Sequence, residues 1–393
     1  MFSLKTSVWQ CTTFEEFAGK AGLGAGDLVI TQSFLYEPYM KGLGLECKFV
    51  LQDRYGAGEP SDEMIARILD DLRAEGLGGA ERLGGDAGLG SAPADSFKRI
   101  VGIGGGTVID IAKLFVLKGL EDPEAAYLRE MPIVKGRELV IVPTTCGTGS
   151  EVTNISIAEL KRKHTKLGLA DNAILPDEAV LIPELLKGLP FKFYVYSAID
   201  ALIHAAESYV SPKATEHSRL FSEAAIHTIL EVFGGIVERG EDYRFERLED
   251  MLVAANMAGI AFGNAGCGPV HALSYPLGGN YHVPHGESNY QFFTHIFKLY
   301  SECRPEGRIA DLNRLFAKEL GLAGDVPAAA VYDALEQRLG SLIARRKLRE
   351  YGMTQEEVRT FAAQVFASQQ RLLSNTYIPM PEEQIAAIYA ALW

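Results

Sequence analysis

The stretch Arg99-Ile-Val-Gly-Ile-Gly104-Gly105-Gly106-Thr107-Val-Ile-Asp110 runs from an apolar segment through glycines into a helical pattern. It predicts a strand over 99–104 and a helix over 108–117. Glycines at such a junction let the backbone approach a ligand, and the helix N-terminus offers free N–H groups to a phosphate. The pattern matches neither G-x-G-x-x-G nor a P-loop, so a tight turn without a ligand is the alternative.

Further apolar runs in the first half predict strands over 27–31, 47–52 and 138–143. A helix is expected from Ser61, which can cap its N-terminus. Strands that alternate with helices favour right-handed βαβ units and a mostly parallel sheet. Ligands of such sheets bind beyond the carboxyl ends of the strands, so residues 1–188 are predicted to form a dinucleotide-binding α/β domain.

The segment Pro143-Thr-Thr-Cys-Gly-Thr-Gly-Ser-Glu151 follows the last of these strands and is rich in hydroxyl groups. It predicts a second turn that binds an anion or an amide, and two such turns in one sheet suit a dinucleotide. Lys166 is either a further polar contact or a surface lysine. The Gly-rich stretch 76–93 has no periodicity and predicts a flexible surface loop.

The second half changes character after Gly188-Leu189-Pro190, where Gly and Pro mark a domain boundary. Strand patterns cease, so residues 189–393 predict an all-helical domain that carries the metal site described next. The expected helices cover 196–210, 216–237, 248–261, 295–303, 309–320, 327–344, 354–373 and 382–392.

Asp200 and His204 stand four residues apart in a segment rich in Ala, Leu and Ile, and so share one face of a predicted helix. A later run from His271 to His285, which also holds His282, is rich in Gly and Pro and predicts a bent backbone rather than a plain helix. One carboxylate with imidazoles from both segments would suit Fe(II) or Zn(II). The alternatives are a surface hydrogen-bonded pair and core histidines, but buried charges need partners or a metal.

Composition narrows the class of protein. The 393 residues carry a formal net charge of -13 and no Lys/Arg-rich run, which argues against nucleic acid or anionic membranes as partners. Neither a secretory signal nor an apolar run of transmembrane length is evident. Five scattered cysteines fit a reducing compartment, so we expect a cytoplasmic protein.

The Gly-Gly-Gly-Thr turn at 104–107, the run 143–151, the Asp200/His204 pair and the late His271/His285 pair together resemble motifs of the iron-containing (group III) alcohol dehydrogenases. The resemblance covers essentially the whole chain. It implies a Rossmann-like domain, a helical domain, a cleft between them, and a homodimer. It also implies a metal held by Asp200, His204, His271 and His285. The implied NAD contacts are Gly104, Gly105, Gly106, Thr107, Thr144, Thr145, Thr148, Thr153, Lys166 and Leu185.

Segments at 151–156, 268–287 and 348–353 are similar to the branch of that family that acts on 4-hydroxybutyrate with NAD. The resemblance therefore implies reversible hydride transfer between NAD(H) and 4-hydroxybutyrate or succinate semialdehyde. A different primary alcohol, a metal- and NAD-dependent lyase similar to dehydroquinate synthase, and a binding protein without catalysis are the alternatives.

Two positions depart from the family pattern. Tyr275 stands where many members have a second histidine, so the proton could leave through Tyr275, His282 or water. Gln32 stands where many NAD-preferring members have an acid that grips the ribose, which leaves NADP open as the cofactor. Arg371 is the candidate anchor for a substrate carboxylate; its alternative role is an exposed arginine near a helix C-terminus.

Overall fold

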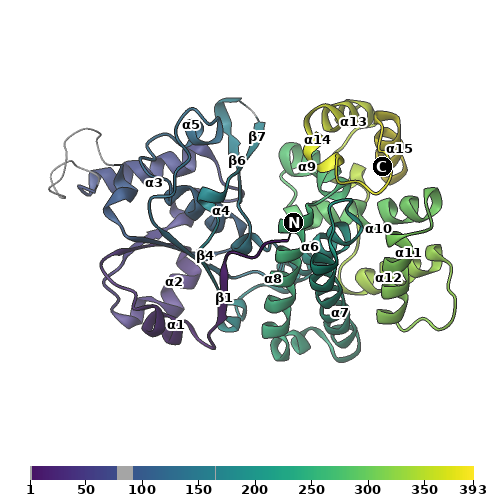
Figure 1. Cartoon of the computed structure of the whole chain (residues 1–393), viewed down its shortest axis with the longest axis horizontal. Helices are drawn as coiled ribbons and strands as arrows, with labels where there is room; N and C mark the ends of the chain where they lie inside the picture. The colour runs from purple at the N-terminus through teal and green to yellow at the C-terminus, as the bar shows by residue number, and fades with distance from the viewer. Residues whose placement is uncertain (1, 78–91, 164) are drawn as a thin grey trace. The chain divides into compact units, whose positions relative to one another are not determined.

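The computed structural model describes residues 2–77, 92–163 and 165–393 (Figure 1). The chain forms two compact units. An α/β unit comprises residues 4–145 and 150–188, and a helical unit comprises residues 189–393 with short segments at the N-terminus and at 146–149. Most of the predicted Gly-rich loop, residues 78–91, lies outside the described part.

The α/β unit is built on a six-stranded sheet in which every pair is parallel, in the order β1-β8-β5-β4-β2-β3. The predicted strands are confirmed as β2 (Asp27–Thr31), β3 (Lys48–Leu51), β4 (Arg99–Gly104) and β5 (Glu138–Pro143). β1 (Ser7–Gln10) and β8 (Glu178–Leu181) were not predicted. β1 has only Val8 and Trp9 as apolar side chains, and the apolar run of β8 is only three residues long.

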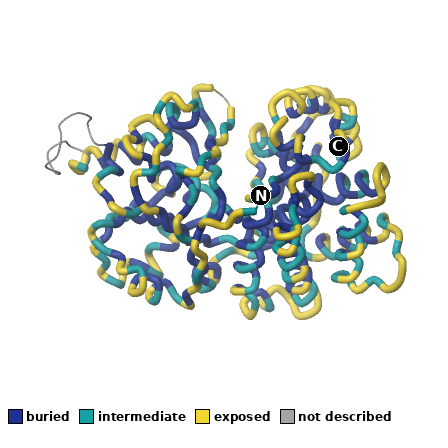
Figure 2. The backbone as a smooth tube through the Cα atoms, viewed as in Figure 1, coloured by how far each residue is buried: buried dark blue, intermediate teal, exposed yellow. Residues whose placement is uncertain are grey.

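Both faces of this sheet are covered. Alternate side chains of β4 point to opposite sides, so Ile100 joins one hydrophobic cluster with α3 (Asp62–Ala74) and α4 (Gly106–Phe115), and Val101 joins the other. The second cluster packs under α1 (Phe14–Ala21) and α2 (Ser33–Tyr39). Burial on both faces explains the continuous apolar strands (Figure 2).

The strands β6 (Ile155–Leu160) and β7 (Thr165–Ala170) and the helix α5 (Pro123–Tyr127) contribute to the same hydrophobic cluster as α4. An antiparallel hairpin, which the sequence did not predict, joins β6 to β7. The short helix α5 contacts it. Ser61 caps α3 as predicted, because its Oγ accepts the backbone N–H of Met64 at 3.2 Å.

The helical unit has no strand among its described residues, as predicted. Its helices are α6 (Phe191–Val210), α7 (Glu216–Arg239), α8 (Leu248–Ala265), α9 (Pro269–Tyr281), α10 (His285–Cys303), α11 (Arg308–Glu319), α12 (Ala328–Leu342), α13 (Glu357–Ser368), α14 (Gln370–Leu373) and α15 (Glu382–Leu392). α6 packs against α7, α8 and α10, which buries nearly all its side chains.

The prediction of a bent, non-helical run from His271 onward is wrong. Residues 271–281 continue α9 through Pro276, and His285 begins α10. Proline weakens a helix interior by about 3 kcal/mol. Here the apolar face of α9, including Leu273 and Leu277, is fully buried, and this packing offsets the local penalty. The expected single helix over 354–373 is likewise divided into α13 and α14.

Within the described residues, α7 is the one single helix long and apolar enough to cross a membrane. α8 and α9 meet the criterion only as a pair bent by 107°. The expectation that no segment approaches this length therefore needs correction. Core helices share such a composition, and α7 packs against α6, α8 and α12, so its apolar side chains have partners within the helical unit.

Candidate metal centre and nucleotide-binding turns

One face of α6 carries three ionisable side chains. Asp200, His204 and Glu207 follow one another at spacings of four and three residues, and all three are buried. These spacings place them in one row along the helix. The Ala, Leu and Ile residues between them fill the rest of the core and supply no competing polar group.

α9 and α10 bring the two later histidines to this row. His271 lies in the first turn of α9, and His285 is the first residue of α10. Next to His285, a Cβ on Gly286 would lie only 2.9 Å from the carbonyl carbon of Tyr196 in α6. Only glycine permits this approach, which sets His285 beside Asp200.

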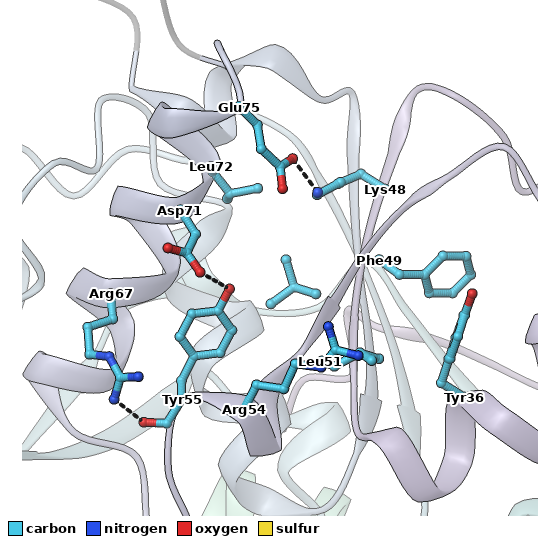
Figure 3. Close-up of a pocket in the computed structure, with 11 residues that line it drawn as sticks. Tyr36, Lys48, Phe49, Leu51, Arg54, Tyr55, Arg67, Asp71, Leu72 and Glu75 are labelled. Carbon is cyan, nitrogen blue, oxygen red and sulfur yellow. Dashed lines mark hydrogen bonds and ion pairs between the residues drawn. The ribbon is translucent and has the colours of Figure 1, made fainter.

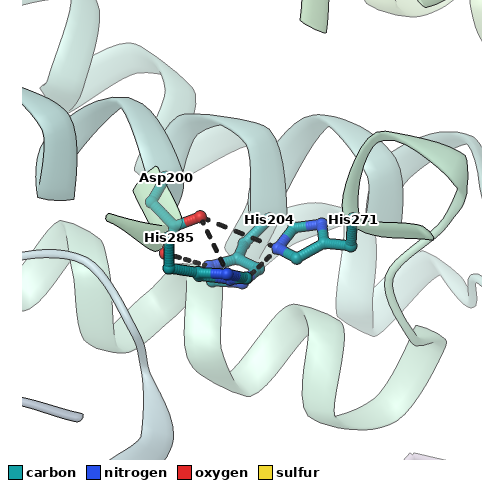
Figure 4. Close-up of side chains that lie close together, drawn as sticks. All are labelled: Asp200, His204, His271 and His285. Atoms are coloured by element: carbon teal, nitrogen blue, oxygen red, sulfur yellow. Dashed lines mark hydrogen bonds and ion pairs between the residues drawn. The ribbon is translucent and has the colours of Figure 1, made fainter. Parts of the chain in front are cut away.

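The four predicted ligands converge (Figure 4). One ligand atom from each of Asp200, His204, His271 and His285 lies within 4.8 Å of all the others. The Nε2 atoms of His204 and His271 are 2.9 Å apart. An oxygen of Asp200 lies 3.7 Å from Nε2 of His271 and 3.8 Å from Nε2 of His285. The structure thus brings together every residue predicted to hold the metal.

The electrostatics of the cluster keep donor atoms available on Asp200 and His204. Burial lowers the pKa of His204 to about 3, although Asp200 opposes this shift, so its ring is neutral. Burial raises the pKa of Asp200, but the three histidines outweigh burial and the net shift is downward, so the carboxylate is ionised. Burial lowers the pKa of His271, but Glu207 and Asp200 raise that pKa by a larger amount, so the net shift is upward.

These observations fit a divalent cation. Nδ1 of His204 is buried and has no hydrogen-bond partner among the described residues. Two imidazole nitrogens at 2.9 Å cannot both carry protons without repulsion. Three imidazoles and a carboxylate suit Fe(II) or Zn(II) and leave a net charge of about +1 on the site. His285 is 40% exposed, so a ligand can reach the cluster from its side.

Neighbouring side chains hold the ligands in place. Asn289, one turn beyond His285 on α10, donates to Asp200 at 2.7 Å. The ring of Phe262 stacks on His204 with 4.3 Å between centroids. Glu207, Cys267 and His271 form a second compact trio, but it shares His271 with the first cluster. Sequence reasoning missed Asn289 and Phe262, because neither residue type signals a role at a metal.

The glycine turn at the end of β4 combines packing and open space. A Cβ on Gly104 would lie 2.6 Å from Val108, so this glycine is needed for α4 to pack on its own strand. A Cβ on Gly105 would meet only the methyl of Thr145 at 3.4 Å. Gly105 precedes the first residue of α4, and no side chain caps this helix. The free backbone N–H groups at the N-terminus of α4 suit a phosphate.

The threonines of the second turn lie beside the first. β5 pairs with β4, and the N–H of Thr144 donates to Gly104 at 3.1 Å. The hydroxyl of Thr145 is buried without a hydrogen-bond partner among the described residues, and a bound ligand could provide one. Thr107, by contrast, donates its hydroxyl to the carbonyl of Gly58 at 2.9 Å.

The glycines of the second turn have a packing role that was not predicted. A Cβ on Gly147 would lie 2.6 Å from the carbonyl oxygen of Ser197 in α6. Gly149, at a φ of 57°, would place a Cβ 2.9 Å from the backbone nitrogen of Gly259 in α8. This segment, which includes Thr148, therefore packs within the helical unit.

A buried lysine that the sequence did not single out supports the end of this turn. Nζ of Lys113 contacts Ser150 Oγ at 2.7 Å, Thr153 Oγ1 at 3.2 Å and the carbonyl of Ile155 at 2.6 Å. Burial lowers the pKa of Lys113 to about 8. Lys113 lies six positions after Thr107, the last residue of the glycine turn, and is buried in α4.

The remaining predicted residues are dispersed. Lys166 lies on β7 and forms an ion pair with Glu59. Leu185 is buried in the core of the α/β unit. Tyr275 lies one turn after His271 on α9 and is partly buried, whereas His282 ends that helix, exposed, at a φ of 54°.

Arg371 is exposed on α14. Burial lowers the pKa of His271. The charges of Glu207 and Asp200 raise this pKa by more, so the net shift is upward, and the charge of Arg371 opposes that upward shift. Gln32, at the end of β2, donates from its side-chain amide to Gln52 at 3.1 Å.

A hollow of about 390 Å³ opens beside β3 and α3 (Figure 3). Its polar side chains pair with one another, as Tyr55 does with Asp71 at 2.8 Å and Lys48 with Glu75. None of the predicted site residues lines it. We assign it no role.

Two family models match the chain. The model described as "Iron-containing alcohol dehydrogenase" matches residues 12–183, and "Fe-containing alcohol dehydrogenase family, C-terminal" matches residues 194–393. Together they cover both units.

Individual relatives agree with the match to these family models. The chain is 48% identical over 393 residues, 100% of both chains, to the 4-hydroxybutyrate dehydrogenase of Clostridium kluyveri. It is 32% identical to the long-chain-alcohol dehydrogenase 1 of Geobacillus thermodenitrificans over 78% of each chain. The structure of sulfoacetaldehyde reductase from Bifidobacterium kashiwanohense, solved with NAD+, superposes with a TM-score of 0.78 at 18% identity, covering 100% of this chain and 98% of that one.

Proposed function

We propose that this chain, which belongs to the iron-containing alcohol dehydrogenase family, reversibly oxidises 4-hydroxybutyrate to succinate semialdehyde with NAD as hydride acceptor. The observation that supports this choice of substrate is the 48% identity over the full length to a 4-hydroxybutyrate dehydrogenase. Relatives that act on other alcohols match less of the chain and at lower identity. A different primary alcohol is therefore the second candidate.

We propose that Asp200, His204, His271 and His285 hold the metal, with Fe(II) as the native ion and Zn(II) as the alternative. Such an ion acts as a Lewis acid on the substrate oxygen. The chain's own part is to keep His204 neutral and Asp200 ionised. The half-exposed His285 marks the side from which the substrate enters.

The α/β unit is proposed to bind the cofactor, and the helical unit the metal, with the boundary near residue 188. The turn with Gly105 and Gly106 would take the pyrophosphate at the N-terminus of α4. The unpaired hydroxyl of Thr145 supports a ligand at the same strand ends. The proposed contacts are Gly104, Gly105, Gly106, Thr107, Thr144, Thr145, Thr148, Thr153, Lys166 and Leu185.

NAD is proposed over NADP, because the side chain of Gln32 is hydrogen-bonded to Gln52 and is not a cation that would attract a 2′-phosphate.

Tyr275 is proposed for the proton path ahead of His282, because Tyr275 follows His271 by one turn whereas His282 lies at an exposed helix end. Cytoplasmic location accords with five free thiols. A homodimer stays a prediction, which sedimentation equilibrium would test.

The test is NADH formation by the metal-loaded protein over a panel of 4-hydroxybutyrate, 1-butanol, 1-propanol and longer alcohols. The proposal expects the highest kcat/KM on 4-hydroxybutyrate. A higher kcat/KM on an uncharged alcohol would favour the second candidate, a dehydrogenase of a different primary alcohol. A lyase would recycle its NAD, so no net NADH from any alcohol would count against a dehydrogenase altogether.

A further inference from the structure

Glu207 makes contacts that exceed those of an ordinary buried carboxylate. Its Oε2 accepts hydrogen bonds from Nδ1 of His271 at 2.6 Å and from the backbone N–H of Gly268 at 2.9 Å. Its Oε1 accepts from the N–H of Val270 at 2.6 Å. The side chain is 2% exposed, so none of these bonds competes with water.

These bonds connect α6 to the start of α9. Gly268 precedes α9 and Val270 lies in its first turn, where backbone N–H groups have no partner within the helix. A carboxylate at this position satisfies two of them and complements the positive end of the helix dipole. A Cβ on Gly268 would lie 3.1 Å from Oε1, so glycine gives the carboxylate room.

The bond to His271 decides which ring nitrogen faces the other ligands. A carboxylate oxygen and a bare imidazole nitrogen repel at 2.6 Å, so Nδ1 must carry the proton. When this ring is neutral, it presents the lone pair of Nε2, which lies 2.9 Å from Nε2 of His204 and 3.7 Å from Asp200. In metal sites, a carboxylate behind an imidazole sets the tautomer and orientation of the ligand.

We infer that Glu207 is a positioning residue, which holds His271 in the tautomer and orientation that the metal requires and at the same time fixes the first turn of α9. This inference rests on the metal site of the proposed function. Glu207 stands behind His271 rather than among the four ligands, because it contacts Nδ1 of that ring whereas His204 lies at Nε2.

The experiment measures the affinity of the apoprotein for Zn²⁺ by competition with a chromogenic chelator. Glu207→Ala removes the acceptor and is expected to weaken binding 10- to 100-fold, the usual effect of losing such a partner. Glu207→Gln keeps the volume and one acceptor oxygen, so it is expected to lose less. Glu336→Gln is the matched control, because Glu336 accepts from Thr294 at 2.5 Å in the same unit without contacting a ligand.

A second measurement separates positioning from a general loss of structure. Protein labelled with ¹⁵N-histidine reports the tautomer of His271 in long-range ¹H–¹⁵N spectra, assigned with His271→Asn. The wild type and the Glu336→Gln control are expected to show the Nδ1-protonated form, and Glu207→Ala a mixture of tautomers.

Unchanged affinity and an unchanged tautomer in a folded Glu207 variant would overturn the inference. Should Glu207→Ala not fold, Glu207→Gln carries the same two readouts, and wild-type values in both would have the same consequence. If the wild-type apoprotein itself shows no tight Zn²⁺ binding, the metal site of the proposed function fails instead.

Discussion

Gly286 and Tyr196 are in backbone contact: a Cβ on Gly286 would lie 2.9 Å from the carbonyl carbon of Tyr196 and closer still to its oxygen. This contact sets the start of α10 against α6, and therefore the position of His285 relative to Asp200. We expect Gly286→Ala to displace His285 and to lower metal affinity at least tenfold, about 1.4 kcal/mol. Chelator competition measures it. Gly279→Ala is the control, since nothing lies within 4 Å of the added Cβ. Equal affinity in both variants would contradict the argument.

Removal of a ligand should separate metal binding from cofactor binding. His204→Ala leaves a carboxylate and two imidazoles, so tight metal binding and turnover are expected to be lost. NAD affinity, measured by calorimetry on the apoprotein, is expected to stay within about twofold, because the glycine turn belongs to the α/β unit. Full metal content with normal turnover in this variant would refute the four-ligand site.

The turn before α4 offers a clean probe of cofactor binding. A Cβ on Gly105 meets only a methyl group at 3.4 Å, so Gly105→Ala is expected to fold normally. We expect it to weaken NAD binding at least tenfold, about 1.4 kcal/mol, because the methyl occupies the space of the pyrophosphate. Gly19→Ala in α1, where the added Cβ meets nothing within 4 Å, serves as the control. A dissociation constant equal to that of the control would remove this turn from the binding site.

Lys113 should leave a signature in the pH dependence of stability. Burial lowers its pKa to about 8 in the folded chain, whereas a lysine in an unfolded chain titrates near 10.4. Between these values the unfolded state binds more protons, so the free energy of unfolding gains from this residue as pH rises from about 8 to 10.4. Urea unfolding of the wild type and of Lys113→Met over this range tests it. The difference between them should shift in favour of the wild type with rising pH, and a constant difference would disprove the assignment.

The carboxylate of the proposed substrate needs a cationic partner, and Arg371 is an exposed residue whose charge acts on His271. Arg371→Ala is expected to lower kcat/KM on 4-hydroxybutyrate about a hundredfold, the ~2–3 kcal/mol of a charge-assisted hydrogen bond, and to spare 1-butanol. Arg359→Ala, on the exposed side of α13, is the control for loss of surface charge. Equal small effects on both substrates would assign the anchor to another residue.

The sequence by itself determined the layered fold and the identity of the four candidate ligands. Buried strands such as β2 and β4 are continuous apolar runs, and α6 shows its polar row through the spacing of Asp200 and His204. These signals are local, because strand and helix periodicities act over a few residues. Short edge strands such as β1 carry too few apolar side chains to be recognised in this way.

Tertiary structure alone decided how the ligands are held. Pro276 and its neighbouring glycines predicted a bend, yet burial of α9 keeps the segment helical. Glu207 and Asn289 are unremarkable in the sequence and gain their roles only when α6, α9 and α10 pack together. The free energy of such packing depends on surfaces far apart in the chain, and local patterns carry no record of which surfaces will meet.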